Sequence, residues 1–204
     1  MKEVEKVTGS WKSDLFQSSE PSKSLLTAGR AVHLTMNKSH SIRNVEYAAK
    51  RFWRSRSGRA VMSVASGART CHIIAIAMSG VELGAAVAMT APSTSCSFDF
   101  TVVDRRYRFR TPDLQYVAGE SIIIVDNSIH TGRTMIATLH ALRRDHGVSG
   151  SIQIVKYIDY QDPLEREVLA KLRRGFGAQV FSVLRISELT QEPSFKHLLS
   201  VKTG

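Results

Sequence analysis

Apolar residues follow two alternating patterns along this chain of 204 residues. Short, mainly apolar runs are typical of strands that are buried on both faces. Such runs predict strands over residues 72–77, 98–103, 122–125, 152–158 and 180–184. Between them, apolar residues recur three or four positions apart, which is typical of helices with one buried face. Helices are therefore predicted over residues 44–56, 135–147 and 162–175, with another in the small-residue segment 82–89.

The alternation of strands and helices predicts an α/β fold in which helices cover both faces of a parallel sheet. Phe52 and Trp53 are expected in the core, and the acids of the helix over 162–175 on a solvated face. Residues 60–65 are expected to form an additional short strand, and residues 25–36 a strand or short hairpin. Residues 1–24 are polar and rich in serine and lysine, so a loose extension is expected there.

The segment 121–147 carries the clearest chemical signal. Its apolar run is followed by Asp126, and then by a polar loop that ends in Thr131-Gly132-Arg133-Thr134. Helical spacing begins after this loop, and Gly147 can end the helix in a left-handed conformation. A helix N-terminus offers free backbone N–H groups and the positive end of a dipole. The segment therefore predicts a phosphate site.

A second strand, glycine loop and helix lie upstream, where the strand over 72–77 leads through Ser79 and Gly80 into the helix over 82–89. Both loops are expected at the carboxyl edge of the sheet, where ligands of such folds bind. Residues 104–113 (DRRYRFRTPD) are strongly basic and have no periodicity. They could neutralise an anionic ligand or form a solvated basic hairpin. Basic residues interleaved with aromatics also suit single-stranded nucleic acid.

The basic composition favours anionic partners but does not identify one of them. The net charge of +10 and the pI near 9.9 favour anions such as nucleic acid, a membrane surface or polyphosphate metabolites. No apolar run has membrane-spanning length, and the N-terminus lacks the apolar core of a secretory signal. A cytoplasmic protein with no membrane partner is therefore expected. Cys71 and Cys96 have no metal-ligand spacing, which favours structural thiols.

The motif IIIVDNSIHTGRT at 122–134 resembles the ribose-5-phosphate loop of the type I phosphoribosyltransferases, with matches at Asp126, Thr131, Gly132 and Thr134. Residues 118–121 (AGES) resemble the glycine turn that precedes this strand in the family. Residues 73–88 (IIAIAMSGVELGAAVA) resemble its pyrophosphate loop and the helix that follows. The resemblance implies a three-layer phosphoribosyltransferase-like domain over 41–204, an N-terminal extension and hood over 1–40, and a small hood formed by the termini.

The resemblance also implies a reaction. Ribose 5-phosphate would pass from phosphoribosyl pyrophosphate to a nitrogen of a nucleobase-like acceptor, with release of pyrophosphate and a requirement for Mg²⁺. Asp126 would bind the ribose and the metal, and Asp126 and Asn127 would both take part in catalysis. The other implied site residues are His130, Thr131, Gly132, Arg133 and Thr134 for the 5-phosphate, Ser79, Gly80 and Arg108 for the pyrophosphate, Arg105 and Arg106 for catalysis, and Asp159 and Tyr160 for the base.

Asn127 stands where the family motif has a second acid. Its amide can hydrogen-bond a ribose hydroxyl, but it stabilises developing positive charge less well than a carboxylate. Two interpretations therefore stay open. One is a phosphoribosyltransferase, and the other is a non-catalytic regulatory protein that binds phosphoribosyl pyrophosphate or a nucleotide and also nucleic acid. A homodimer is implied by the resemblance.

Overall fold

The computed structural model describes residues 41–76, 80–92, 96–104, 114, 116–159 and 163–185. Five strands form one sheet in the order β2-β1-β3-β4-β5, and every neighbouring pair is parallel. The strands are β1 (Thr70–Ile76), β2 (Ser97–Val103), β3 (Ser121–Asp126), β4 (Ile152–Asp159) and β5 (Gln179–Arg185). The predicted parallel α/β sheet is therefore confirmed.

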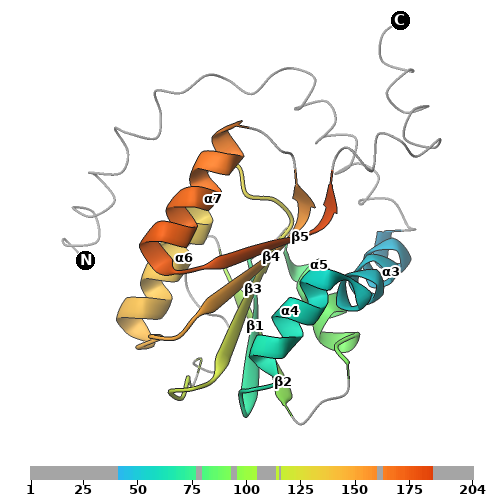
Figure 1. Ribbon diagram of the computed structural model, residues 1–204, viewed down its shortest axis with the longest axis horizontal. Helices are drawn as coiled ribbons and strands as arrows, with labels where there is room; N and C mark the ends of the chain where they lie inside the picture. Colours follow the sequence, from blue (N-terminus) through green and yellow to red (C-terminus); the bar gives the residue numbers. More distant parts are fainter. Residues whose placement is uncertain are drawn as a thin grey trace, which may run out of the picture.

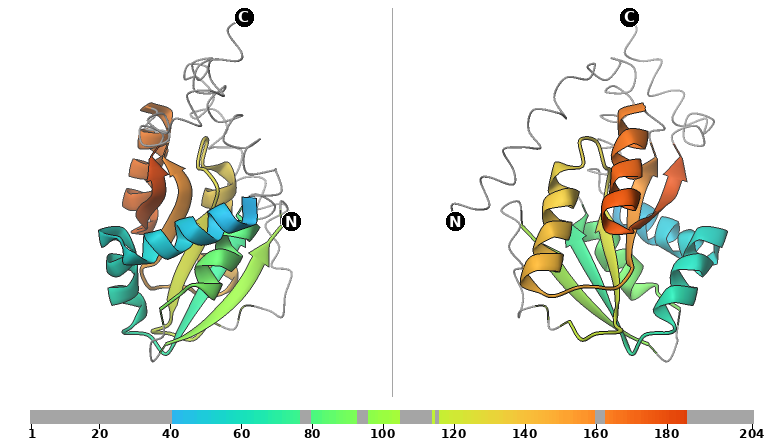
Figure 2. Two further views of the ribbon diagram at one scale, coloured as in Figure 1. Left: turned by 90° about the vertical axis from the view of Figure 1, so that its right-hand side faces the viewer. Right: turned by 60° about the vertical axis from the view of Figure 1, so that its left-hand side comes forward.

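Two layers of helices cover the two faces of this sheet (Figure 1). One layer contains α3 (Ser41–Arg54), α4 (Arg56–Ala65) and α5 (Val81–Met89), and the other contains α6 (Arg133–Asp145) and α7 (Pro163–Phe176). The views in Figure 2 show the same arrangement from two other sides, with α6 and α7 next to each other. The predicted three-layer architecture is confirmed.

Each helical layer packs on its own apolar core. Along β3, Ile122 and Ile124 pack with the α6–α7 layer, whereas Ile123 and Val125 pack with the other layer. Successive side chains of a strand point to opposite faces, so a strand covered on both sides consists mainly of apolar residues without alternation. All six residues of β3 are buried, which explains its continuous apolar run.

The segment before β1 differs from the prediction. A helix end at Ser57-Gly58 and a strand over residues 60–65 were expected, but α4 occupies this region instead. Ser55 begins α4 as its N-cap, and its Oγ accepts a 3.1 Å hydrogen bond from the N–H of Gly58. A Cβ at Gly58 would lie 2.1 Å from the backbone oxygen of Phe52. The glycine thus permits a tight turn between two helices, and a helix follows it because Ser55 caps the new N-terminus.

The two glycines expected to end helices behave differently. Gly147 has a φ of 63° after α6, as predicted. Gly175 lies inside α7, so its predicted role as the helix end is wrong. Gly177 ends this helix instead, with a φ of 63° and an N–H that donates to the carbonyl oxygen of Arg173 at 3.0 Å.

Several predictions concern other parts of the chain. The extension and hood over residues 1–40, the strand or hairpin over 25–36 and the segment after Arg185 lie outside the described residues. Within the described ranges, no helix is both long and apolar enough to cross a lipid bilayer.

Candidate functional site

The strand order reverses between β1 and β3. From this pair, β2 extends the sheet on one side and β4 and β5 extend it on the other. Loops that leave the carboxyl ends of two such strands diverge, and ligands bind in the crevice between them. Asp126 ends β3 at this point, and Gly80 begins α5 after β1. The two segments predicted to bind phosphate groups therefore flank the same reversal.

Gly80 brings the start of α5 against the end of β3. Its N–H donates to the carbonyl oxygen of Ile76 at 2.8 Å. A Cβ at this position would lie 2.4 Å from the backbone oxygen of Val125, the residue before Asp126. Only glycine allows this approach without displacing β3, so Gly80 sets the distance between the two loops. In the first turn of α5, Glu82 occupies a position that the helix dipole favours for an acid.

Asp126 ends β3 and Asn127 follows it, and each is only 7% exposed. Oδ1 of Asp126 accepts a 2.7 Å hydrogen bond from the backbone N–H of Asn127. The carbonyl oxygen of Asn127 accepts a 3.0 Å bond from the N–H of Ile158, which ties the loop to β4. These bonds hold the backbone of both residues in place.

The side chain of Asn127 has an unusual environment. Its Oδ1 is buried and accepts no hydrogen bond from any residue in the described part of the chain. A buried acceptor without a donor costs about 1–3 kcal/mol. A ligand hydroxyl that donated to this oxygen would recover that cost. This oxygen is therefore an acceptor that a ligand hydroxyl could satisfy.

The loop after Asn127 presents a helix N-terminus to solvent. Ile129 is buried and anchors the loop, whereas His130 and Thr131 are exposed. Gly132 is the N-cap of α6, with a φ of 67° and no side-chain cap. A Cβ there would lie 2.3 Å from Cγ1 of Val168 in α7. This left-handed glycine turn into a helix is an arrangement that binds phosphate through backbone N–H groups.

The end of β4 carries a cluster that the sequence pattern did not predict. Lys156 is 1% exposed, and its Nζ lies 2.9 Å from Oδ1 of Asp159 and 2.5 Å from Oε1 of Glu165. Glu165 in α7 is 2% exposed, so the expectation that the acids of this helix are all solvated is wrong. The available signal was a lysine within the apolar run of 152–158, since a buried ammonium requires an acidic partner.

The pKa of Glu165 responds to burial and to two neighbouring charges. Burial raises the pKa of this carboxyl above its usual value, the ammonium of Lys156 opposes that increase, and the carboxylate of Asp159 adds to it. Lys156 is also the register partner of Asp126 in the neighbouring strand. Register partners of a parallel pair project from the same face of the sheet. The cluster therefore adjoins the end of β3 as well as the end of β4.

The turn that precedes β3 lies at the opposite edge of the sheet. Gly119 has a φ of 95°, in agreement with the glycine turn expected at residues 118–121. Glu120 Oε2 lies 2.7 Å from Nε2 of buried His72 and accepts a 2.7 Å bond from the N–H of Val117. Burial acts to raise the pKa of Glu120, but these two hydrogen bonds outweigh it and lower the pKa. Glu120 therefore supports β3 and is remote from the carboxyl edge.

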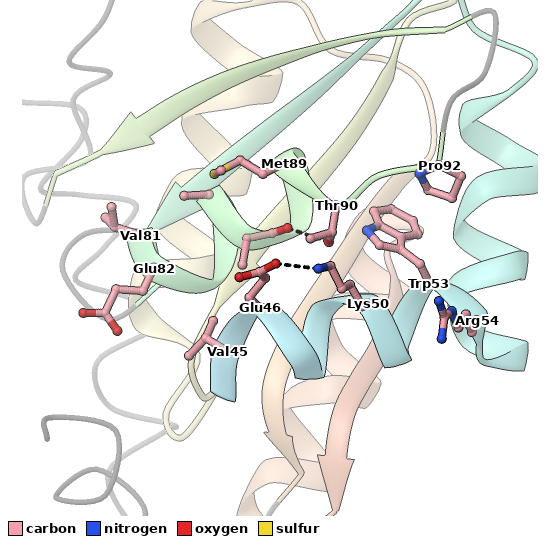
Figure 3. Close-up of a pocket in the computed structure, with 12 residues that line it drawn as sticks. Val45, Glu46, Lys50, Trp53, Arg54, Val81, Glu82, Met89, Thr90 and Pro92 are labelled. Carbon is pink, nitrogen blue, oxygen red and sulfur yellow. Dashed lines mark hydrogen bonds and ion pairs between the residues drawn. The ribbon is translucent and has the colours of Figure 1, made fainter. Parts of the chain in front are cut away.

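A cavity of about 710 Å³ lies between α3 and α5 (Figure 3). Trp53 and Val45 line it from α3, and Met89 lines it from α5; a Glu46–Lys50 ion pair of 2.5 Å forms part of its wall. None of the residues predicted to bind the substrate lines this cavity. It is therefore distinct from the loop that follows β3.

The predicted site residues divide into two groups. The residues that the structure places at the carboxyl edge of the sheet or in the loops and helix starts that follow it are Gly80, Asp126, Asn127, His130, Thr131, Gly132, Arg133, Thr134 and Asp159. The residues that lie outside the described part of the chain are Ser79, Arg105, Arg106, Arg108 and Tyr160.

The fold and this edge define an α/β protein with a left-handed glycine turn into a helix N-terminus at the switch point of a parallel sheet. The phosphoribosyl transferase domain family matches residues 53–168, which is more than half of the chain. The chain belongs to this family, and the resemblance to type I phosphoribosyltransferases is confirmed.

The fold is also similar to that of a solved structure, the orotate phosphoribosyltransferase of Francisella tularensis. The two chains are 15% identical, with 81% of this chain and 77% of that chain covered and a TM-score of 0.52. At this identity the similarity concerns the fold. No match was found among curated protein sequences.

Proposed function

We propose that this protein transfers ribose 5-phosphate from phosphoribosyl pyrophosphate to a nitrogen of a nucleobase-like acceptor and releases pyrophosphate. The observation that carries the proposal is the pair Asp126 and Asn127, buried at the switch point beside a left-handed glycine turn. A sugar hydroxyl can donate to the orphaned Oδ1 of Asn127, while its phosphate binds at the N-terminus of α6. Family membership supports the same reaction class.

The roles of the loop residues follow from this placement of the sugar at Asn127 and the phosphate at the N-terminus of α6. Backbone N–H groups of residues 130–134 and the hydroxyls of Thr131 and Thr134 would bind the 5-phosphate. Asp126 would accept from the ribose hydroxyls and attract the partly positive ribose of the transition state. Ser79 and Gly80 would contact the pyrophosphate, while Arg105, Arg106 and Arg108 would neutralise its charge. Asp159 and Tyr160 would contact the base.

Asp126 also suits a role in binding Mg²⁺. Magnesium is commonly held by one or two carboxylates together with substrate phosphate oxygens, so a single buried carboxylate beside a phosphate site fits this ion. Within the described residues, no group of three or more His, Cys, Asp or Glu side chains forms a metal cage of its own. When bound, Mg²⁺ would neutralise clustered oxygen charge on the leaving pyrophosphate.

Calorimetry and a product assay test the proposal. Phosphoribosyl pyrophosphate with Mg²⁺ is expected to bind the purified protein, and a panel of nucleobases is then assayed for pyrophosphate release. Asp126→Ala should lose ribose binding and turnover. Asp145→Ala serves as the matched control, because it removes an exposed acid at the far end of α6. Unchanged affinity of the Asp126 variant for phosphoribosyl pyrophosphate would show that the site is assigned incorrectly.

Asn127 favours a second candidate, a regulatory protein that binds phosphoribosyl pyrophosphate or a nucleotide without turning it over. The net charge of +10 suits a nucleic-acid partner for such a protein. Binding of phosphoribosyl pyrophosphate without release of pyrophosphate in the presence of any base, together with salt-dependent RNA or DNA binding, would favour this candidate over the transferase.

We also propose that the protein is a homodimer located in the cytoplasm. Light scattering of the purified protein measures its oligomeric state.

A further inference from the structure

The end of α3 and the start of α4 carry basic charge that the proposed reaction does not use. Residues 47–81 contain no acid, and their basic residues supply most of the net charge of +10. These basic residues are Lys50, Arg51, Arg54, Arg56, Arg59 and Arg69. Lys50 forms an ion pair with Glu46, and Arg69 directly precedes β1. The other four arginines are exposed, and no carboxylate in the described part of the chain forms an ion pair with them.

These four arginines form one continuous surface, which we call the arginine corner. Arg51 and Arg54 are neighbours on one face of α3, because side chains three positions apart on a helix lie about 5–6 Å from each other. The same relation holds between Arg56 and Arg59 on α4. Nη1 of Arg59 donates to the carbonyl oxygen of Arg54 at 2.8 Å, which joins the two pairs. The tight turn at Gly58 holds the two helices together at this corner (Figure 2).

Helix stability accounts for only part of the arginine corner. Arg51 and Arg54 lie in the last turn of α3, where the helix dipole favours cations. Arg56 is the first residue of α4, where the dipole disfavours a cation, and this helix has no acid in its first turn. Like charges on neighbouring positions of a helix also repel one another. An anion bound at the corner would relieve this repulsion.

An exposed tyrosine extends the same surface. Tyr47 lies four positions before Arg51 on α3, so the two side chains are neighbours. Tyr47 is 69% exposed, whereas Phe52 and Trp53 on the same helix are buried. Nε1 of Trp53 also donates to the carbonyl oxygen of Val87 in α5 at 3.0 Å. The core therefore contains the other aromatic side chains of α3, and Tyr47 faces solvent beside the arginines.

We propose that the arginine corner and Tyr47 form a binding surface for single-stranded nucleic acid. The planar guanidinium of arginine pairs with phosphate oxygens through two parallel hydrogen bonds. An exposed aromatic ring offers a face on which an unpaired base stacks. A duplex keeps its bases stacked on one another, so it would use the arginines but not the ring.

A lipid surface fits the described side chains less well. An amphipathic helix binds a membrane through a row of apolar residues. The exposed neighbours of Tyr47 along α3 are charged, and they are Glu46, Lys50, Arg51 and Arg54. A single aromatic ring among charged groups suits a polynucleotide, which presents phosphates and bases side by side.

The inference goes beyond the proposed function and does not depend on it. The surface belongs to the layer that contains α3, α4 and α5, whereas the loop predicted to bind the 5-phosphate leads into α6 of the other layer (Figure 1). None of the residues assigned to the transferase reaction belongs to the surface.

Fluorescence anisotropy with labelled oligonucleotides tests the tyrosine on the full-length chain. The probes are a polyuridine RNA, a polythymidine DNA and a DNA duplex, each of about 20 nucleotides per strand, which exceeds the roughly 4–16 nucleotides of a typical single-strand site. Tyr47→Ala should weaken single-strand binding about fivefold or more, because one stacked base is lost, and should leave duplex binding unchanged. Tyr47→Phe is the matched control, since it keeps the ring, and it should keep the wild-type affinity.

A triple variant tests the arginines through the salt dependence of binding. Arg51→Gln, Arg54→Gln and Arg56→Gln are combined, which keeps the bond from Arg59 to the backbone of Arg54. For a single strand, each phosphate contact contributes about −0.7 to the slope of log K against log salt concentration. Loss of three contacts should therefore make this slope less steep by about 2. Glutamine is a good helix former, so the variant is expected to fold.

The control variant removes the same charge from α7. It combines Arg166→Gln, Arg173→Gln and Arg174→Gln, which are exposed positions of that helix. Both triple variants have the same net charge, so a difference between them reports the location of the contacts. The control should keep the wild-type slope, and both variants should keep the wild-type affinity for phosphoribosyl pyrophosphate.

The outcomes decide the inference separately from the transferase proposal. A reduced slope in the α3–α4 variant alone, with weaker single-strand binding in Tyr47→Ala, would support it for RNA, for DNA or for both, whichever probe binds. Equal slopes in the two triple variants, or unchanged single-strand affinity in Tyr47→Ala, would overturn it. Binding to vesicles that contain phosphatidylserine but to no oligonucleotide would assign the surface to a membrane and would also overturn it. In each of these negative cases the assay of pyrophosphate release is unaffected.

Discussion

Gly132 at the start of α6 lies against Val168 in α7, so that a Cβ on the glycine would be 2.3 Å from Cγ1 of the valine. The same glycine has a φ of 67°. A steric constraint between two helices and a conformational constraint within the loop therefore act on one residue. Together they set the position of the predicted phosphate-binding loop relative to the α6–α7 layer.

Gly132→Ala is expected to lower the free energy of unfolding by about 1–3 kcal/mol, because alanine is strained in this conformation and would also displace Val168. Binding of ribose 5-phosphate should be lost as the loop moves. Urea unfolding and calorimetry measure the two effects. Gly175→Ala is the control, since a Cβ there meets no atom within 4 Å and the residue lies inside a helix. Equal stability of the two variants would contradict the steric role of Gly132.

Asn127→Asp is expected to increase the rate of pyrophosphate release about tenfold or more, because a second carboxylate would stabilise the positive charge that develops on the ribose. The variant should also be less stable, since it puts two buried acids next to each other. Initial rates at saturating substrate and urea midpoints give the two measurements. An unchanged or lower rate would indicate that the amide of Asn127 has a role of its own.

The hydrogen bonds of Glu120 are expected to make the free energy of unfolding depend on pH. Its pKa is lower in the folded protein than its usual value of 4.5, where hydrogen bonds from His72 and Val117 outweigh burial. As the pH falls below about 4.5, the unfolded chain binds the proton first, so this contribution is present above that pH and is lost below it. Glu120→Gln should therefore lose less stability than the wild-type protein between pH 6 and pH 3. Parallel urea titrations at several pH values check this; identical pH profiles would exclude the linkage.

Cys71 is expected to resist alkylation in the folded protein. Burial raises the pKa of its thiol to about 12, with a further contribution from Cys96. The thiolate fraction at pH 8 is then on the order of one in ten thousand, and the thiolate is the reactive form. Iodoacetamide should label Cys71 only after the protein is unfolded in urea, as mass spectrometry of the peptides would show. Rapid labelling of Cys71 in the native protein would contradict its burial.

Local features of the sequence predicted most of the framework. Mainly apolar runs identified all five strands, because a strand covered on both faces has few positions for polar side chains, of which Lys156 in β4 is one. The strand, polar loop and glycine turn around Asp126 and Gly132 were also predictable, since this motif is local in sequence, whereas the contact of Gly132 with Val168 was not. The errors before β1 arose because the turn at Gly58 depends on its contact with Phe52 and on the cap from Ser55.

Tertiary structure alone decided how these parts combine. The sequence contains Lys156 and Glu165 but does not show that they meet, because their contact requires α7 to pack on β4. The sequence also contains Gly80 and Val125 but does not show that they lie close together. Their contact depends on β1 and β3 being neighbours where the strand order reverses. Periodicity and turn chemistry act over a few residues and can be recognised in the chain. The contacts that assemble the site join residues far apart in sequence, and they arise only when the sheet and its two helical layers are complete.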